Sequence, residues 1–224
     1  MEQQDHGIFK LISLSIRHYK MFNFMCTLLF LLILYALLED YKYAYFVVKS
    51  LSVVVFIAGI YVAGSTRKSI IILKILAIPW LFSEWFFITS TNTVFLSFFF
   101  FAYITAILLD KIIQTKDVTL DTLYAAVCIY IMLGLLWASI YGLVNQVVPG
   151  EIIFKNGNST QPTVNEIIYF SYTTLTTLGY GDIVSLSPVG RIISVLQAII
   201  GQLFIAFLVA RLVSIFSQKS FIKK

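Results

Sequence analysis

The sequence predicts an all-α membrane protein with six transmembrane helices and one shorter helix that enters the membrane and turns back. Three observations predict this fold. Of the 224 residues, 59% are hydrophobic and 12% are charged, against about 25% charged residues in a typical soluble domain. Six stretches are apolar over the roughly 20 residues that a helix needs to cross a bilayer. One stretch, TTLTTLGYGD at 173–182, interrupts this pattern with hydroxyl groups and glycines.

The apolar stretches follow one another with short connections. They cover residues 21–38, 43–64, 69–88, 93–113, 120–144 and 190–216. The first is longer than the apolar part of a signal peptide, and no convincing small-residue cleavage site follows it, so we interpret it as a helix. The segment before it, residues 1–20, is cytoplasmic or interfacial. Its part at 8–20 alternates apolar and basic residues, and either lies on the inner leaflet or forms a solvated leader.

Basic residues gather in alternate connections and near both ends of the chain. They are Lys10, Arg17, Lys20, Arg67, Lys68, Lys111, Lys116, Arg211, Lys219, Lys223 and Lys224. Because Lys and Arg favour the cytoplasmic side of a membrane, we expect both termini in the cytoplasm of a multi-pass protein of a plasma or inner membrane. The same distribution attributes the net charge of +5 to membrane orientation rather than to a nucleic-acid partner.

The connection at 145–189 differs from the others. It begins with a polar loop, residues 145–162, after which Thr163 and Glu166 have the spacing of a capping box that starts a helix. This helix runs to about Thr176 and is too short to span a membrane, so we expect it to be re-entrant.

The residues after this helix predict a binding site for a dehydrated cation. Non-helical backbone at membrane depth is stable only where it is buried in protein or lines water. Gly179 and Gly181 permit conformations that other residues avoid, which lets consecutive carbonyls face a pore. A ring of such carbonyls replaces the hydration shell of K⁺. We therefore expect K⁺ ligands at Thr177, Leu178, Gly179 and Tyr180, with the Thr177 hydroxyl as the lowest ring. The Tyr180 side chain points away and packs the loop against the re-entrant helix, whose negative C-terminal end favours a cation.

The pattern T-x-T-T-x-G-Y-G-D at 174–182 resembles the signature of potassium channels. The resemblance covers residues 120–216 and implies an outer helix, a pore helix, a selectivity filter and an inner helix. The filter would consist of Thr177, Leu178, Gly179, Tyr180 and Gly181. The pore domain would then occupy residues 117–216, between a four-helix domain at 21–116 and a short cytoplasmic tail at 217–224. Since the family's carbonyl ring uses four filter segments and this chain has one, the resemblance implies a homotetramer in membrane lipid.

Two positions depart from the family pattern. Leu178 stands where valine is most frequent, so a weakly selective cation channel is the alternative within this class. Thr173 stands where many bacterial two-helix channels have a glutamate that pairs with the aspartate after the filter. Asp182 therefore needs another partner, for which Tyr169 is the candidate. Together with Thr176, which closes the top of the inner cavity, these residues form the predicted support of the filter.

The inner helix contains candidates for a gate. The resemblance makes Gly201 a candidate hinge, because glycine weakens a helix locally; the alternative is a small residue for close packing. Ile205, Phe207 and Leu208 are candidates for an inner constriction, from their position alone.

The first four helices resemble those of voltage-gated channels in topology only. Each elementary charge that crosses the membrane contributes about 2.3 kcal/mol per 100 mV, and residues 93–109 contain no Arg or Lys. We therefore expect weak voltage dependence or none. Lys49 and Glu84 lie at similar depths from the outer end, and either form an ion pair or both extend to the interface.

The competing class is a helical membrane enzyme or a scaffold subunit. Both histidines, His6 and His18, precede the first helix, and Cys26 and Cys128 lie in apolar runs without metal-ligand spacing. We therefore predict no enzyme and no cofactor, with K⁺ as the transported ion.

Overall fold

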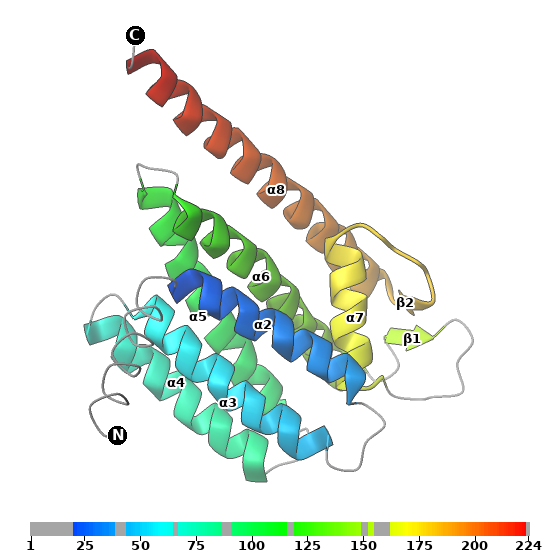
Figure 1. Cartoon of the computed structure of the whole chain (residues 1–224). Coiled ribbons are helices and arrows are strands. Elements are labelled where there is room, and N and C mark those ends of the chain that lie inside the picture. The colour runs from blue at the N-terminus through cyan, green and yellow to red at the C-terminus, as the bar shows by residue number, and fades with distance from the viewer. Residues whose placement is uncertain are drawn as a thin grey trace, which may run out of the picture.

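The computed structural model describes residues 20–38, 44–64, 67–86, 91–115, 119–148, 152–154 and 162–222. This part of the chain forms seven helices and one two-stranded sheet (Figure 1). The elements are α2 (Lys20–Leu37), α3 (Ala44–Ala63), α4 (Arg67–Phe86), α5 (Thr91–Gln114), α6 (Leu120–Val147), β1 (Ile152–Phe154), α7 (Val164–Leu175), β2 (Ile183–Ser185) and α8 (Pro188–Ile222).

Each of the six predicted membrane helices corresponds to one observed helix, α2 to α6 and α8. Among the described residues, three helical stretches are long and apolar enough to cross a membrane, namely Thr93–Gln114, Leu120–Val147 and Pro188–Arg211. Shorter apolar stretches occur at Lys20–Tyr35 and Ser52–Ala63. The chain is therefore a multi-pass membrane protein, and the full set of six crossings stays a prediction.

A small sheet corrects the all-α expectation. Strand β1 lies within the segment predicted to be a polar loop and pairs antiparallel with β2, with Ile152 opposite Ser185 and Phe154 opposite Ile183. Helix α6 also continues to Val147, three residues into that predicted loop. Three-residue strands are too short to show a recognisable alternation of apolar and polar residues, so the sequence pattern does not reveal them. The sheet fixes the chain directly after Asp182.

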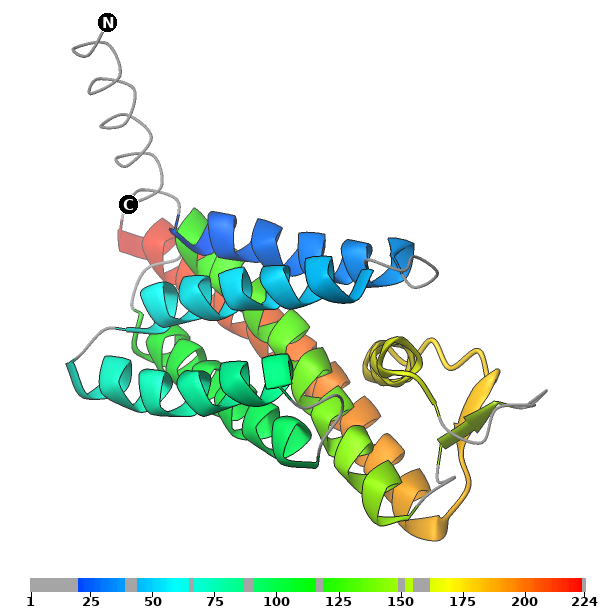
Figure 2. The ribbon, with the colours of Figure 1, turned by 90° about the horizontal axis from the view of Figure 1, so that it is seen from below.

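The helices α2 to α6 share one apolar core. Helices α2 and α5 both pack along α6, and Phe24, Leu28 and Met132 are almost fully buried between them. In the middle of the bundle, the ring of Phe56 stacks on Trp80 at 3.9 Å and on Phe100 at 3.7 Å between centroids. Figure 2 shows α7 and the sheet on the side of α6 that faces away from α3 and α4.

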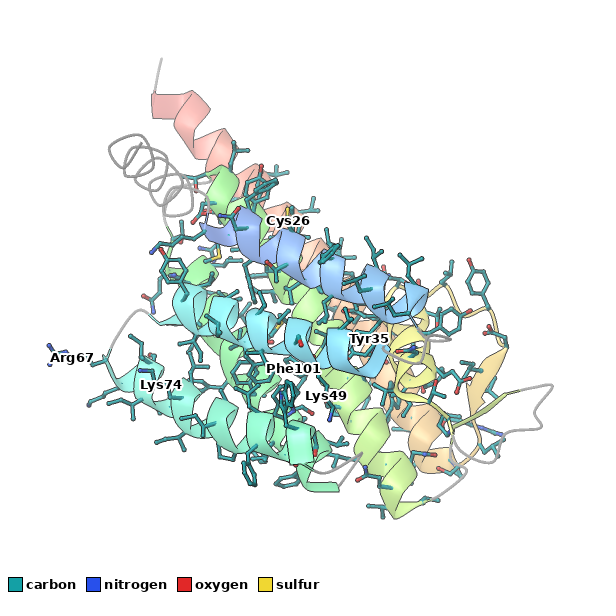
Figure 3. The ribbon with its side chains drawn as sticks, turned by 60° about the horizontal axis from the view of Figure 1, so that its bottom comes forward. Cys26, Tyr35, Lys49, Arg67, Lys74 and Phe101 are labelled. Atoms are coloured by element: carbon teal, nitrogen blue, oxygen red, sulfur yellow. The ribbon has the colours of Figure 1, made fainter. Side chains whose placement is uncertain are left out.

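Hydrogen bonds connect this bundle to the C-terminal helices near both ends. The Asn165 amide at the start of α7 donates to the Tyr35 carbonyl of α2 at 3.1 Å; Figure 3 labels Tyr35. At the other end, the Arg211 guanidinium of α8 donates to the carbonyls of Ile113 and Thr115 at 2.6 and 2.8 Å. These carbonyls terminate α5, where a positive charge also interacts favourably with the helix dipole.

The charges within the first four helices differ in burial. Lys49 is 4% exposed, whereas Arg67 and Lys74 of α4 are exposed (Figure 3). Burial of the Lys49 ammonium within protein favours the ion-pair alternative over extension to the interface, because a buried charge is stable only when it is paired. The side chain of Glu84 lies outside the described residues, as does the N-terminal segment 1–19, so both predictions stay open.

Candidate functional site

Helix α7 starts with the capping box that the sequence predicts. The Glu166 backbone N–H donates to Thr163 Oγ1 at 3.3 Å, and the Thr163 N–H donates to Glu166 Oε2 at 2.6 Å. Two N–H groups that would otherwise lack partners are thus satisfied. The helix ends at Leu175, with Thr176 as its C-cap.

The chain leaves α7 through a turn that is tied to the last turn of the helix. Thr177 has a φ of 60°, the left-handed conformation that commonly ends a helix. Its N–H donates to the Thr174 carbonyl at 3.0 Å, and the N–H of Gly179 donates to the Thr173 carbonyl at 3.1 Å. Residues 177–181 lie outside the sheet of β1 and β2, and we call this segment the 177–181 strand. Its start is therefore positioned by α7 itself.

The sign of φ alternates along this strand. It is positive at Thr177, Gly179 and Gly181, at 60°, 51° and 77°, and the intervening Leu178 and Tyr180 lie outside the positive-φ region. A β-branched residue rarely adopts positive φ, and does so only where its surroundings determine it. Alternation between right- and left-handed conformations gathers successive N–H groups on one side, which leaves the carbonyls on the other.

The strand is open to its surroundings within one chain. Leu178 is 55% and Tyr180 69% exposed, and among the described residues other than the chain neighbours, none has an atom within 4 Å of a Cβ built on Gly179 or Gly181. Conformation rather than space therefore requires glycine at these two positions. The packing of the Tyr180 side chain between this loop and a pore helix stays a prediction.

The predicted contact of Asp182 is present. The Tyr169 hydroxyl donates to Asp182 Oδ2 at 2.7 Å, and the Ile183 N–H donates to Asp182 Oδ1 at 3.0 Å. The bond from Tyr169 lowers the pKa of Asp182, and in turn raises the pKa of Tyr169. Thr173 instead donates within its own helix, to the Phe170 carbonyl at 3.1 Å.

Gly201 of α8 lies against the C-terminal end of α7. A Cβ at this position would lie 2.3 Å from the Leu175 carbonyl oxygen. This contact supports the packing alternative, while the hinge stays a prediction. The same carbonyl accepts a hydrogen bond from the Tyr130 hydroxyl at 3.3 Å. Both neighbouring helices therefore meet α7 at its last residue.

Gln202 is a residue of the site that the sequence analysis missed. Its amide donates to Thr177 Oγ1 at 3.4 Å, so α8 reaches the first residue of the strand. Thr176, the neighbouring predicted support residue, donates its hydroxyl to the Tyr172 carbonyl at 2.7 Å. A polar side chain in an apolar membrane helix is the sequence signal that could have identified Gln202.

The three candidates for the inner constriction differ in exposure. Ile205 is 41% and Phe207 55% exposed. Leu208 is partly buried and packs against the core of α2 to α6. Ile205 and Phe207 are therefore the better candidates for lining an inner passage.

A buried polar cluster between α6, α7 and α8 was also missed by the sequence analysis. Gln197 of α8 is fully buried, and contacts Ser171 of α7 and Tyr141 of α6 through hydrogen bonds. As for Gln202, a polar residue in an apolar run is the sequence signal for Gln197, but its partners on α7 and α6 are visible only in the structure.

Comparison with known protein families assigns this region. Residues 129–218 match a family model described as an ion channel. A search of curated proteins found no match. The matched residues include most of α6, all of α7, the 177–181 strand and most of α8. This multi-pass membrane protein therefore carries an ion-channel pore domain at residues 129–218 and is not an enzyme.

Proposed function

We propose that four copies of this chain form a channel that conducts K⁺ passively and selects K⁺ over Na⁺. The observation that carries the proposal is the alternation of φ along 177–181, directly after a capped re-entrant helix. In this conformation the carbonyls of Thr177, Leu178, Gly179 and Tyr180 would replace the water around K⁺, with the Thr177 hydroxyl as a further ligand. The C-terminal end of α7, which carries partial negative charge, favours a cation there.

The exposure of the filter supports a tetramer. Its backbone is polar and open within one chain, and such backbone at membrane depth needs water or protein around it, not lipid. Four copies around one axis provide both, with the carbonyls toward the ions and the other side against neighbouring chains. Helix α8 is also largely uncovered, since 11% of an apolar 18-residue window within Pro188–Arg211 is buried.

We further propose that the channel is not strongly voltage-gated. Residues 93–109 of α5 contain no basic residue. Lys111, near the end of this helix, donates to the Val62 carbonyl at 3.2 Å. The described part of α5 therefore offers no row of mobile positive charges on which a membrane potential could act.

The test is a recording of the purified full-length protein in planar bilayers with K⁺ on one side and Na⁺ on the other. We expect a reversal potential close to the K⁺ equilibrium value and a tetramer by native mass spectrometry. A reversal potential near zero would favour the weakly selective alternative that Leu178 suggests. An assembly with another number of subunits would contradict the proposal as a whole.

A variant connects this measurement to the filter. Gly179→Ala places a side chain on a residue with φ of 51°, which residues other than glycine avoid. We expect this variant to lose selectivity. Gly142→Ala is the matched control, since its Cβ would meet only a side-chain methyl group of Val94 at 3.1 Å.

A further inference from the structure

Gln197 joins three helices of the pore domain through one side chain. Its Nε2 donates to the Ser171 carbonyl at 2.8 Å and to Ser171 Oγ at 3.0 Å, while its Oε1 accepts from the Tyr141 hydroxyl at 2.6 Å. Ser171 Oγ in turn donates to the Gly134 carbonyl at 2.7 Å. Gln197 and Ser171 are fully buried and Tyr141 is 1% exposed. The cluster therefore connects α8, α7 and α6 out of contact with water and lipid.

Every polar group of the Gln197 side chain has a partner in this cluster. Both amide hydrogens meet an oxygen of Ser171, and the amide oxygen meets a hydroxyl group. A satisfied buried network specifies one arrangement of its helices, because a shift leaves polar groups without partners in a medium of low dielectric constant. The energy of the cluster therefore depends on the position of α7 relative to its two neighbours.

The cluster also sets the register of α8 along α7. Gln197 contacts Ser171, and one helical turn later Gly201 contacts Leu175. Residues four apart lie on the same face of a helix, so these two contacts fix both the rotation and the axial position of the two helices. A hydrogen bond fixes one turn and a close approach of backbones fixes the next.

The backbone couples the position of α7 to the geometry of the filter. Ser171 is two residues before Thr173, whose carbonyl accepts the N–H of Gly179. A rotation of α7 that moves Ser171 would therefore also move the atom that anchors the filter strand. Small displacements matter there, because selection between ions depends on the placement of the coordinating carbonyls.

We propose that Gln197 is a positioning residue for ion selection, which holds the pore helix so that the filter keeps its spacing. This inference rests on the proposed function of the 177–181 strand. Gln197 acts through α7 and does not touch the ion.

Two substitutions separate hydrogen bonding from volume. Gln197→Met keeps a long flexible side chain but removes all three bonds. Gln197→Glu keeps the shape, and its carboxyl group stays protonated in this buried site, so it accepts from Tyr141 and donates to Ser171. In bilayer recordings we expect the Na⁺/K⁺ permeability ratio to rise about tenfold in Gln197→Met, the scale of one lost buried hydrogen bond. We expect Gln197→Glu to stay within about twofold of the wild type, since most of the network persists.

A control removes a buried hydrogen bond elsewhere in the bundle. Thr93→Val breaks the contact between Thr93 Oγ1 and Ser83 Oγ, at 2.5 Å, which joins α4 and α5. We expect this variant to keep the permeability ratio of the wild type. An equal change of the permeability ratio in Thr93→Val and Gln197→Met would mean that general destabilisation causes the effect, and would overturn the proposal. A wild-type permeability ratio in Gln197→Met would also overturn it.

Other outcomes are also decisive. If Gln197→Met does not assemble, Ser171→Ala takes its place, since it removes the hydroxyl contacts but keeps the carbonyl that accepts from Gln197. We expect its Na⁺/K⁺ permeability ratio to lie between that of the wild type and a tenfold higher value. An unchanged permeability ratio overturns the proposal. If the wild type itself does not select K⁺, the proposed function fails. The inference is then decided by unitary conductance, which should change in Gln197→Met and not in Gln197→Glu.

Discussion

The bundle of α2 to α6 and the filter region of α7 and α8 differ in how much of their structure one chain completes. In the bundle, Phe24, Leu28 and Met132 are enclosed by their own chain. In the filter region, Leu178 and Tyr180 are more than half exposed. The two long helices show the same difference: 56% of an apolar 18-residue window in Leu120–Val147 is buried, but 11% of such a window in Pro188–Arg211. The bundle therefore depends on side-chain packing within one chain, whereas the filter region depends on backbone geometry that, in the proposed tetramer, further copies would complete.

Alanine at two glycines should separate these regions most strongly. Gly201→Ala would place a Cβ 2.3 Å from the Leu175 carbonyl oxygen, whereas Gly59→Ala in the bundle would meet the end of the Ile104 side chain at 2.7 Å. A backbone carbonyl must shift the helix, while a side chain can rotate. We expect Gly201→Ala to cost about 1–3 kcal/mol per chain, and to abolish tetramers and current. Gly59→Ala should keep both, as measured by size-exclusion chromatography and bilayer recording. Assembly of Gly201→Ala with altered open probability would instead favour the hinge.

Removal of K⁺ should destabilise the filter region and spare the bundle. The positive φ at Thr177 is unfavourable for a β-branched residue, and a bound ion would offset that cost. At a K⁺ concentration 100-fold above the dissociation constant, binding contributes about 2.7 kcal/mol. We expect a lower midpoint of tetramer dissociation on heating after exchange of K⁺ for choline. Hydrogen exchange in α3 and α4 should not change. Equal protection by Na⁺ and K⁺ would count against a selective site.

The connection between the two regions can be weakened at the end that lies away from the filter. Arg211→Gln removes a charged donor from the carbonyls of Ile113 and Thr115. We expect a loss of about 1 kcal/mol in stability, with faster hydrogen exchange at the end of α5. Arg67→Gln, at an exposed position on α4, is the control and should have little effect. Unchanged exchange in Arg211→Gln would show that the two regions do not depend on this contact.

The smallest effect should come from Tyr169→Phe, which acts only on the protonation of the outer filter region. The Tyr169 bond lowers the pKa of Asp182 below its ordinary value of 3.8 and raises that of Tyr169 above 10. Its contribution is therefore fully present from about pH 4 to about pH 10; it is lost as the pH falls through the pKa of Asp182 or rises through that of Tyr169. We expect the acidic midpoint of the current to move to higher pH in Tyr169→Phe. An unchanged midpoint would mean that Asp182 does not control this titration.

The sequence predicted most of the fold because long apolar stretches and capping residues act locally. The capping box of Thr163 and Glu166 depends on a three-residue spacing, and the structure confirms it. The sheet of β1 and β2 could not be predicted, because it pairs two three-residue segments about thirty residues apart and depends on the turn of the filter.

The site was predictable where conformation restricts the residue type and unpredictable where contacts decide. The positive φ values at positions 179 and 181 require glycine, so the spacing of Gly179 and Gly181 in the sequence predicts the strand. Gln197 and Gln202 act through partners 26 and 25 residues away, and no local pattern marks such pairs. For Gly201 the sequence offered two explanations, and the contact with Leu175 supports packing.

One consequence follows from the hydrogen bond between Asn165 and Tyr35 of the same chain. Helix α7 is thus tied to α2 of the same chain, and α5 packs on α6 of the same chain. In the proposed tetramer, four such chains could close around an axis without exchanging helices between neighbours. Assembly would then need only collision in the membrane plane, and no subunit would have to unfold to admit the next.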